Sequence, residues 1–111
     1  HGLDSSNNPV LINSLKPTVS VMNNGHTKGC GAGSFAALKG AKSIQAMWQV
    51  HKNLRKKDPE NNTNEDFIAN LTDRDGCKGH YLKLSVAGDG KSYVIYNPRN
   101  GKKVTYQTQA R

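Results

Sequence analysis

The chain has 111 residues and a mass of 12.1 kDa, and its 16 Lys and Arg against 8 Asp and Glu give a formal net charge of +8. A chain of this length forms one small domain, and its apolar runs are far shorter than the roughly 18 residues that a membrane-spanning helix needs. We therefore expect a single domain over residues 1–111 and no membrane-spanning segment. The first residues carry no basic-then-apolar leader, and the sequence assigns no compartment.

The positive charge falls into two segments separated by an acidic one. Residues 1–57 hold eight basic residues and one acid, residues 58–77 hold one basic residue and six acids, and residues 78–111 hold seven basic residues and one acid. A basic protein attracts anionic partners through long-range attraction and counterion release. Nucleic acid or another polyanion is therefore a candidate partner, and a merely solvated basic surface is the alternative.

Caps and breakers predict the first elements. Capping residues precede Pro9, which suits the first turn of a helix, and Pro17 ends the segment. The β-branched run Thr18–Met22 is typical of a strand and leads into an Asn-Asn-Gly turn. The sequence thus predicts a short helix over residues 10–15 followed by a strand.

The middle of the chain gives weaker local signals. Four glycines within residues 25–33 make a pliable loop that lacks the spacing of a phosphate-binding loop. Ser34 is a candidate cap for a helix that ends near Gly40. The segment 43–50 suits either a helix or a strand, because its periodicity does not decide between them. Thr63 is followed by acidic residues, which predicts a further short capped helix.

The last third predicts a three-stranded antiparallel meander. Residues 81–86 alternate between polar and apolar side chains, as a half-buried strand does. Turn signals at residues 88–90 and 98–101 separate this segment from two further strands, at 93–96 and 104–106. The predicted fold class is therefore mixed α+β, or an α/β remnant, with a helix–strand–helix first half and a meander in the second half.

The two cysteines, Cys30 and Cys77, permit one disulfide at most, and neither stands at a spacing typical of a zinc site. We expect two unpaired thiols. A nucleophile–base pair is one alternative at the glycine loop, because His26 lies four residues before Cys30 and a thiolate requires a nearby base. The sequence shows no third group that orients the imidazole, so a structural loop histidine is the competing interpretation.

Two pieces of the first forty residues together follow a known pattern. His1-Gly2-Leu3-Asp4-Ser5-Ser6 precedes the predicted helix, and Lys16-Pro17-Thr18-Val19-Ser20-Val21-Met22-Asn23-Asn24-Gly25 follows it. This order resembles the final motif of metallo-β-lactamase-fold hydrolases, in the branch that includes DNA-uptake competence proteins and related secreted hydrolases. In that branch a His-His-Gly turn is followed by a helix and a Lys-Pro-x-Val-Ala-Val-type strand. The resemblance implies that this chain corresponds to the carboxyl-terminal part of the fold.

The resemblance also implies an activity, namely hydrolysis of an ester, phosphodiester or lactam by water activated on one or two zinc-like ions. The family takes most of its metal ligands from a His-x-His-x-Asp-His motif, which this sequence lacks. His1 stands at a family position. We therefore take His1 and Asp4 as candidate catalytic residues, and His1, Asp4 and His26 as candidate ligands of zinc or a similar divalent metal. Stable sites use three or four ligands, so a partner chain or a rearrangement has to complete this one.

The meander supports a hypothesis of a different class, a basic module that binds nucleic acid or another polyanion without catalysis. Aromatic rings on a sheet can stack on bases while lysines contact phosphates. The candidate residues are Tyr81, Lys83, Lys91, Tyr93, Lys102, Lys103 and Tyr106. The alternative is that the tyrosines cover the core edge while the lysines protect exposed strand edges.

A homodimer is a further expectation. Half of a layered fold leaves sheet edges and an apolar face uncovered, and pairing two copies is one way to bury them.

Overall fold

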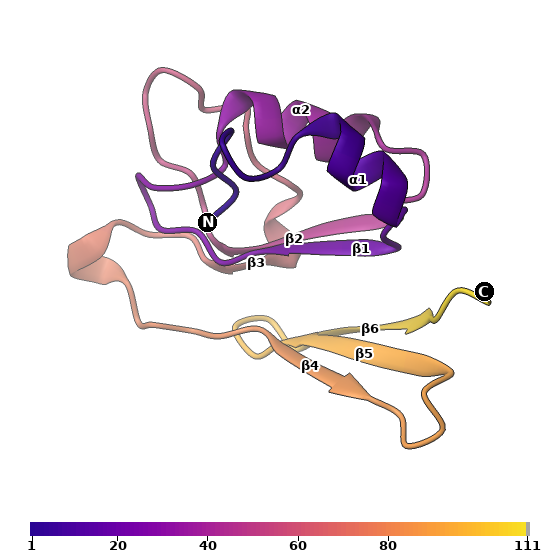
Figure 1. Ribbon diagram of the computed structural model, residues 1–111. Helices are drawn as coiled ribbons and strands as arrows, with labels where there is room; N and C mark the ends of the chain where they lie inside the picture. Colours follow the sequence, from indigo (N-terminus) through magenta and orange to yellow (C-terminus); the bar gives the residue numbers. More distant parts are fainter. Residues whose placement is uncertain (111) are drawn as a thin grey trace.

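The first half of the chain forms a parallel sheet with two helices on one face (Figure 1). The computed structural model describes residues 1–110. The elements of this half are α1 (Pro9–Leu15), β1 (Val19–Met22), α2 (Ala32–Gly40), β2 (Ala46–His51) and β3 (Ile68–Asn70), with single 3-10 turns at Glu65–Phe67 (η1) and Arg74–Gly76 (η2). The strands pair in parallel in the order β1-β2-β3, so the ambiguous segment 43–50 is a strand.

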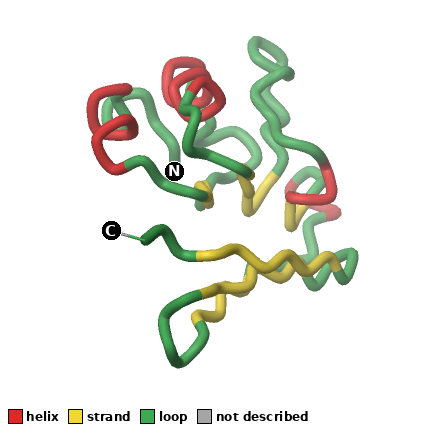
Figure 2. The backbone as a smooth tube through the Cα atoms, turned by 90° about the vertical axis from the view of Figure 1, so that its right-hand side faces the viewer, coloured by secondary structure: helices red, strands yellow, loops and turns green. Residues whose placement is uncertain are grey.

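The second half forms the predicted antiparallel meander. It consists of β4 (Lys83–Val86), β5 (Ser92–Asn97) and β6 (Lys102–Gln107), in that spatial order. This sheet packs on the face of the parallel sheet that the helices leave open (Figures 1 and 2). The prediction of a mixed α+β fold, with a helix–strand–helix first half and a meander second half, is confirmed.

Contacts at three points show that β6 crosses beneath all three parallel strands, as Figure 2 also shows. At one end, the Lys102 ammonium lies 5.1 Å from the centroid of the Phe67 ring, just before β3. Midway, the hydroxyl of Tyr106 accepts a hydrogen bond of 3.0 Å from the indole of Trp48 on β2. Beyond the other end, the Gln109 amide donates to the hydroxyl of Thr18, next to β1.

Two hydrophobic clusters lie on opposite faces of the parallel sheet. The first lies between the sheet and the helices and consists of Ile12, Met22, Cys30, Phe35, Leu38 and Ala41. The second lies between the two sheets and centres on Trp48, Ile95 and Tyr106. Trp48 and Ile95 are fully buried, and the Trp48 and Phe67 rings pack edge to face with centroids 4.5 Å apart. Burial of large apolar side chains on both faces of one sheet holds the three layers together.

The helix predicted from the first residues is confirmed, and its caps explain its limits. The side chain of Asn8 accepts a hydrogen bond of 2.9 Å from the backbone N–H of Leu11, and Pro9 occupies the first turn. Lys16 ends the helix in the left-handed region, where its N–H donates to the carbonyl of Ile12. Pro17 then prevents continuation.

The prediction of a helix after Thr63 is wrong. Asn64, rather than Thr63, caps a single 3-10 turn, and the chain continues directly into β3. Ile68 and Ala69 are fully buried, and Ile68 pairs with Gln49 of β2. Long-range strand pairing and burial outweigh the local helix signals of the acidic residues here.

Both cysteines are unpaired, as expected. Within residues 1–110, no helix has the length and apolar character needed to cross a bilayer.

Candidate functional site

The amino-terminal residues are docked onto the glycine loop. The backbone N–H of Cys30 donates to the carbonyl of His1 at 3.1 Å, and the N–H of Gly31 donates to the carbonyl of Gly2 at 2.8 Å. Gly29 has a φ of 93°, and a Cβ at this position would collide with the His1 carbonyl. The close approach of the two segments therefore requires glycine at position 29.

The carboxylate of Asp4 caps helix α2. Its Oδ1 accepts a hydrogen bond of 2.8 Å from the backbone N–H of Ser34, near the positive end of the helix dipole. The hydroxyl of Ser34 donates to the Leu3 carbonyl at 2.8 Å. Ser34 is thus inside the helix, and the prediction that it is the N-cap is wrong; a carboxylate thirty residues away in sequence supplies the cap.

Arg55 holds the other side of the glycine loop. Its guanidinium donates to both carboxylate oxygens of Asp58, at 2.8 and 2.9 Å, and to the carbonyls of Thr27, Gly29 and Cys30. The hydrogen bonds from Arg55 hold the pKa of the Asp58 carboxyl below its usual value. The loop is therefore fixed from two sides, by the amino-terminal residues and by this ion pair.

The geometry does not favour a nucleophile–base pair at Cys30. Its thiol is fully buried beside the sulfur of Met22, and burial raises its pKa to about 11. A thiolate is the reactive form of cysteine, so this thiol is poorly reactive near neutral pH. The ring of His26 packs against that of His51 instead, with centroids 5.7 Å apart.

The three predicted metal ligands are not brought together into a site. Asp4 is engaged as a helix cap, and His26 contacts His51. His51 was not among the predicted site residues, because only the fold brings β2 next to this loop. Among residues 1–110, no group of three or more His, Cys, Asp and Glu side chains is arranged to hold a metal ion. The described residues alone therefore do not complete the one- or two-metal centre that the family resemblance implies.

The outward face of the antiparallel sheet brings several of the predicted binding residues together. The register places Lys83 of β4, Tyr96 of β5 and Lys103 of β6 in one row across the three strands. The Lys103 ammonium lies 5.3 Å from the centroid of the Tyr96 ring. This row borders a shallow cavity of about 400 Å³ whose remaining lining residues are Tyr81, Ser85 and Val94.

The structure places three other predicted binding residues on the inward face. Tyr93 and Tyr106 stack with ring centroids 5.5 Å apart in the core between the sheets. Lys102 lies over Phe67 and pairs with Asp66 at 3.5 Å. These three residues therefore do not share the outward face with Lys83 and Lys103, because alternate residues of a strand point to opposite faces.

Lys91 does not line the outward cavity either. Its backbone N–H donates to the carboxylate of Asp89 in the turn between β4 and β5. Tyr96, which lines the outward cavity, was not among the predicted binding residues. Tyr96 lies three residues after Tyr93 on the same strand. Because side chains alternate between the two faces of a strand, this spacing places Tyr96 on the face opposite Tyr93, and the spacing can be seen in the sequence.

Comparisons of this chain with protein-family models, with curated proteins and with solved structures give no match.

Proposed function

We propose that the outward face of the antiparallel sheet binds single-stranded nucleic acid. The observation that carries this proposal is the Lys83–Tyr96–Lys103 row, in which one aromatic ring is flanked by two cations across three strands. Tyr81, with 58% of its surface exposed, adds a second ring beside the row. Exposed rings stack on unpaired bases, and flanking cations contact phosphates.

The charges around the row suit a polyanion. No acidic side chain lines the cavity. Among the described residues, the ion pairs are Lys52–Glu65, Arg55–Asp58 and Lys102–Asp66, so Lys83 and Lys103 have no acidic partner. Two unpaired ammonium groups on a chain of net charge +8 favour phosphate binding through release of counterions.

The proposal is tested by fluorescence anisotropy with a labelled oligothymidylate at several salt concentrations. A double Lys83→Gln, Lys103→Gln variant should bind more weakly, and its salt slope should fall by about 1.4 because each lost contact with a single strand contributes about 0.7. The matched control is Lys42→Gln with Lys56→Gln, two exposed lysines away from this sheet that change the net charge equally. Equal losses of oligothymidylate affinity in the two double variants would contradict a binding site localised at Lys83 and Lys103.

A second variant separates stacking from charge. Tyr96→Ala should weaken oligothymidylate binding by about 1–3 kcal/mol, the usual contribution of one stacked base. Inorganic polyphosphate carries phosphates without bases, so its affinity should not depend on the Tyr96 ring. If Tyr96→Ala leaves oligothymidylate binding unchanged, the face is a general polyanion surface and the stacking proposal fails.

The second candidate is the metal-dependent hydrolase that the family resemblance implies, with further ligands supplied by another chain or segment. The observation that favours it is the fixed position of the His1–Asp4 turn beside a cleft of about 500 Å³, which Asp4, Lys28 and Arg55 help to line. This cleft borders the loop that follows β1, and open α/β sheets bind ligands beyond the carboxyl ends of their strands.

Zinc titration followed by calorimetry tests this candidate. Binding should weaken in His1→Ala and be unaffected in His80→Ala, a histidine outside the proposed site. Equal binding by the two variants would exclude a role for His1. If a second copy supplies the missing ligands, the sedimentation mass should double when zinc is added, and a mass of one chain with zinc bound would rule out the homodimer as their source.

A further inference from the structure

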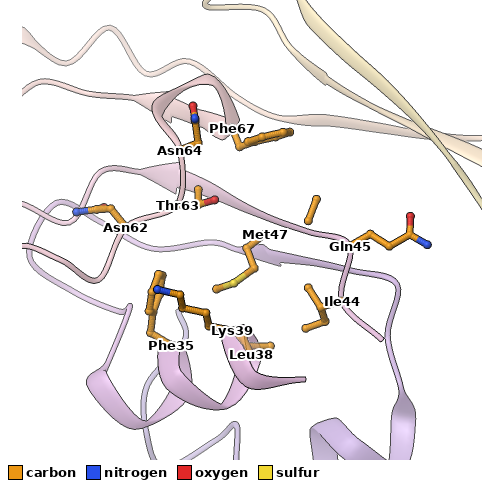
Figure 3. Close-up of a pocket in the computed structure, with 11 residues that line it drawn as sticks. Phe35, Leu38, Lys39, Ile44, Gln45, Met47, Asn62, Thr63, Asn64 and Phe67 are labelled. Atoms are coloured by element: carbon orange, nitrogen blue, oxygen red, sulfur yellow. The ribbon is translucent and has the colours of Figure 1, made fainter. Parts of the chain in front are cut away.

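A further cavity lies beside α2, near the start of β2 and β3. The connection from β2 to β3, residues 52–67, contains one 3-10 turn and no α-helix. Connections between parallel strands usually carry a helix that covers the sheet. Here the irregular segment leaves a cavity of about 380 Å³ between α2, β2 and residues 62–67 (Figure 3).

One part of the cavity lining is apolar. Phe35 and Leu38 contribute from α2, Ile44 and Met47 from the segment leading into and through β2, and Phe67 from η1. Figure 3 shows Met47 pointing from β2 toward α2. A cavity above about 300 Å³ that combines aliphatic and aromatic side chains with a few polar groups has the size and character of a small-molecule site.

The polar wall opposite α2 is held in place by one buried side chain. Gln49, which is fully buried, donates from Nε2 to the Asn62 side chain at 3.0 Å and accepts a bond of 2.6 Å at Oε1 from the Thr63 backbone N–H. Asn62 also accepts a bond from the backbone N–H of Asn53 at 2.7 Å. This wall is therefore preorganised, which lowers the cost of binding.

The charged side chain that lines the cavity is positive. Lys39, in the last turn of α2, is the charged residue of the lining, and it has no ion pair among residues 1–110. No Asp or Glu lines the cavity. Apolar side chains from α2 and β2, with Lys39 as the single cation beside them, complement a molecule that has an apolar body and one negative group.

We propose that this cavity binds a small amphiphilic carboxylate, such as a medium-chain fatty acid. The apolar chain packs against Phe35, Leu38 and Met47, and the carboxylate pairs with Lys39. The site lies beside α2 and shares no lining residue with the cavity on the outward face of the antiparallel sheet, so it is independent of the proposed nucleic-acid site.

Octanoate is the probe for this site, with binding followed by calorimetry and by amide chemical shifts. Octanoate should shift the amides of residues 35–47 and 62–67, and octylamine, which has the same chain and the opposite charge, should bind more weakly. Lys39→Gln should weaken octanoate binding about tenfold through loss of a charge-assisted contact, while 1-octanol binding is unchanged. Lys42→Gln, which changes an exposed lysine outside the cavity, should leave octanoate affinity unaltered.

A cavity-filling variant, Ile44→Trp, should abolish octanoate binding and leave oligothymidylate binding unchanged. Lys39 is exposed, so Lys39→Gln keeps the proposal falsifiable even if Ile44→Trp does not fold. Equal affinity for octanoate and octylamine, unchanged octanoate binding by Lys39→Gln, or shifts confined to other residues would each overturn the proposal.

Discussion

The two faces of the antiparallel sheet carry the same residue types in different roles. On the inward face, Tyr106 accepts a hydrogen bond from Trp48, and Lys102 is paired with Asp66. On the outward face, Tyr96 and Lys103 contact each other and border an open cavity. Lys102 and Lys103 are neighbours in sequence, yet one lies at the junction between the sheets and the other on the open face.

This difference shows that residue type alone does not identify a binding residue in a sheet. A tyrosine with its hydroxyl engaged and its ring buried contributes to stability, whereas a half-buried tyrosine that lines an open cavity beside an unpaired lysine is available to a ligand. Variants of adjacent residues can therefore separate effects on stability from effects on binding.

The largest expected difference is between Ile95→Ala and Val94→Ala. Ile95 is fully buried between the sheets, so its truncation should lower the free energy of unfolding by about 2–5 kcal/mol. Val94 lines the outward cavity, and its truncation should cost less than about 1 kcal/mol. Urea denaturation measures both values. Similar losses in the free energy of unfolding for the two variants would mean that the inward and outward faces of the antiparallel sheet are equally packed.

A smaller effect is expected when a tyrosine hydroxyl is removed from each face. Tyr106→Phe leaves the buried indole N–H of Trp48 without its acceptor, which should cost about 1–3 kcal/mol in stability. Tyr96→Phe keeps the stacking ring on the outward face and should change neither stability nor oligothymidylate affinity appreciably. If Tyr106→Phe is as stable as the parent chain, the Trp48–Tyr106 hydrogen bond does not hold the two sheets together.

The smallest effect concerns pH. Burial raises the pKa of the Tyr106 hydroxyl in the folded chain. The protonated Tyr106 hydroxyl therefore contributes fully to stability below its pKa in the unfolded chain, about 10. This contribution is lost as pH rises through the higher pKa of the folded chain. The stability difference between the parent chain and Tyr106→Phe should narrow above about pH 10, as measured by urea denaturation from pH 8 upward. A difference that stays constant across this range would show that Tyr106 does not titrate with unfolding.

Local signals in the sequence were sufficient for several elements. Asn8, Pro9 and Pro17 define α1 through caps and a breaker that act within a few residues. The meander followed from alternation and from turn residues such as Asp89 and Gly90. These features depend on neighbours in sequence, so they are visible without the fold.

The features that were missed depend on distant contacts. Strand β3 replaced a predicted helix because Ile68 is buried against β2, and Asp4 rather than Ser34 caps α2. The hydrogen bond between Trp48 and Tyr106 joins residues 58 positions apart. For the candidate binding face, the sequence grouped Tyr81, Lys83 and Lys103 with Tyr93, Lys102 and Tyr106. The packing of the two sheets places the last three on the inward face.

The most direct test of the account is to map oligothymidylate binding by nuclear magnetic resonance. Spectra of the backbone amides and tyrosine rings, recorded as oligothymidylate is added, compare the two faces in a single sample. The account predicts shifts in Tyr81, Lys83, Tyr96 and Lys103, with the rings of Tyr93 and Tyr106 little changed. Shifts centred on another surface, or no shifts at low salt, would contradict it.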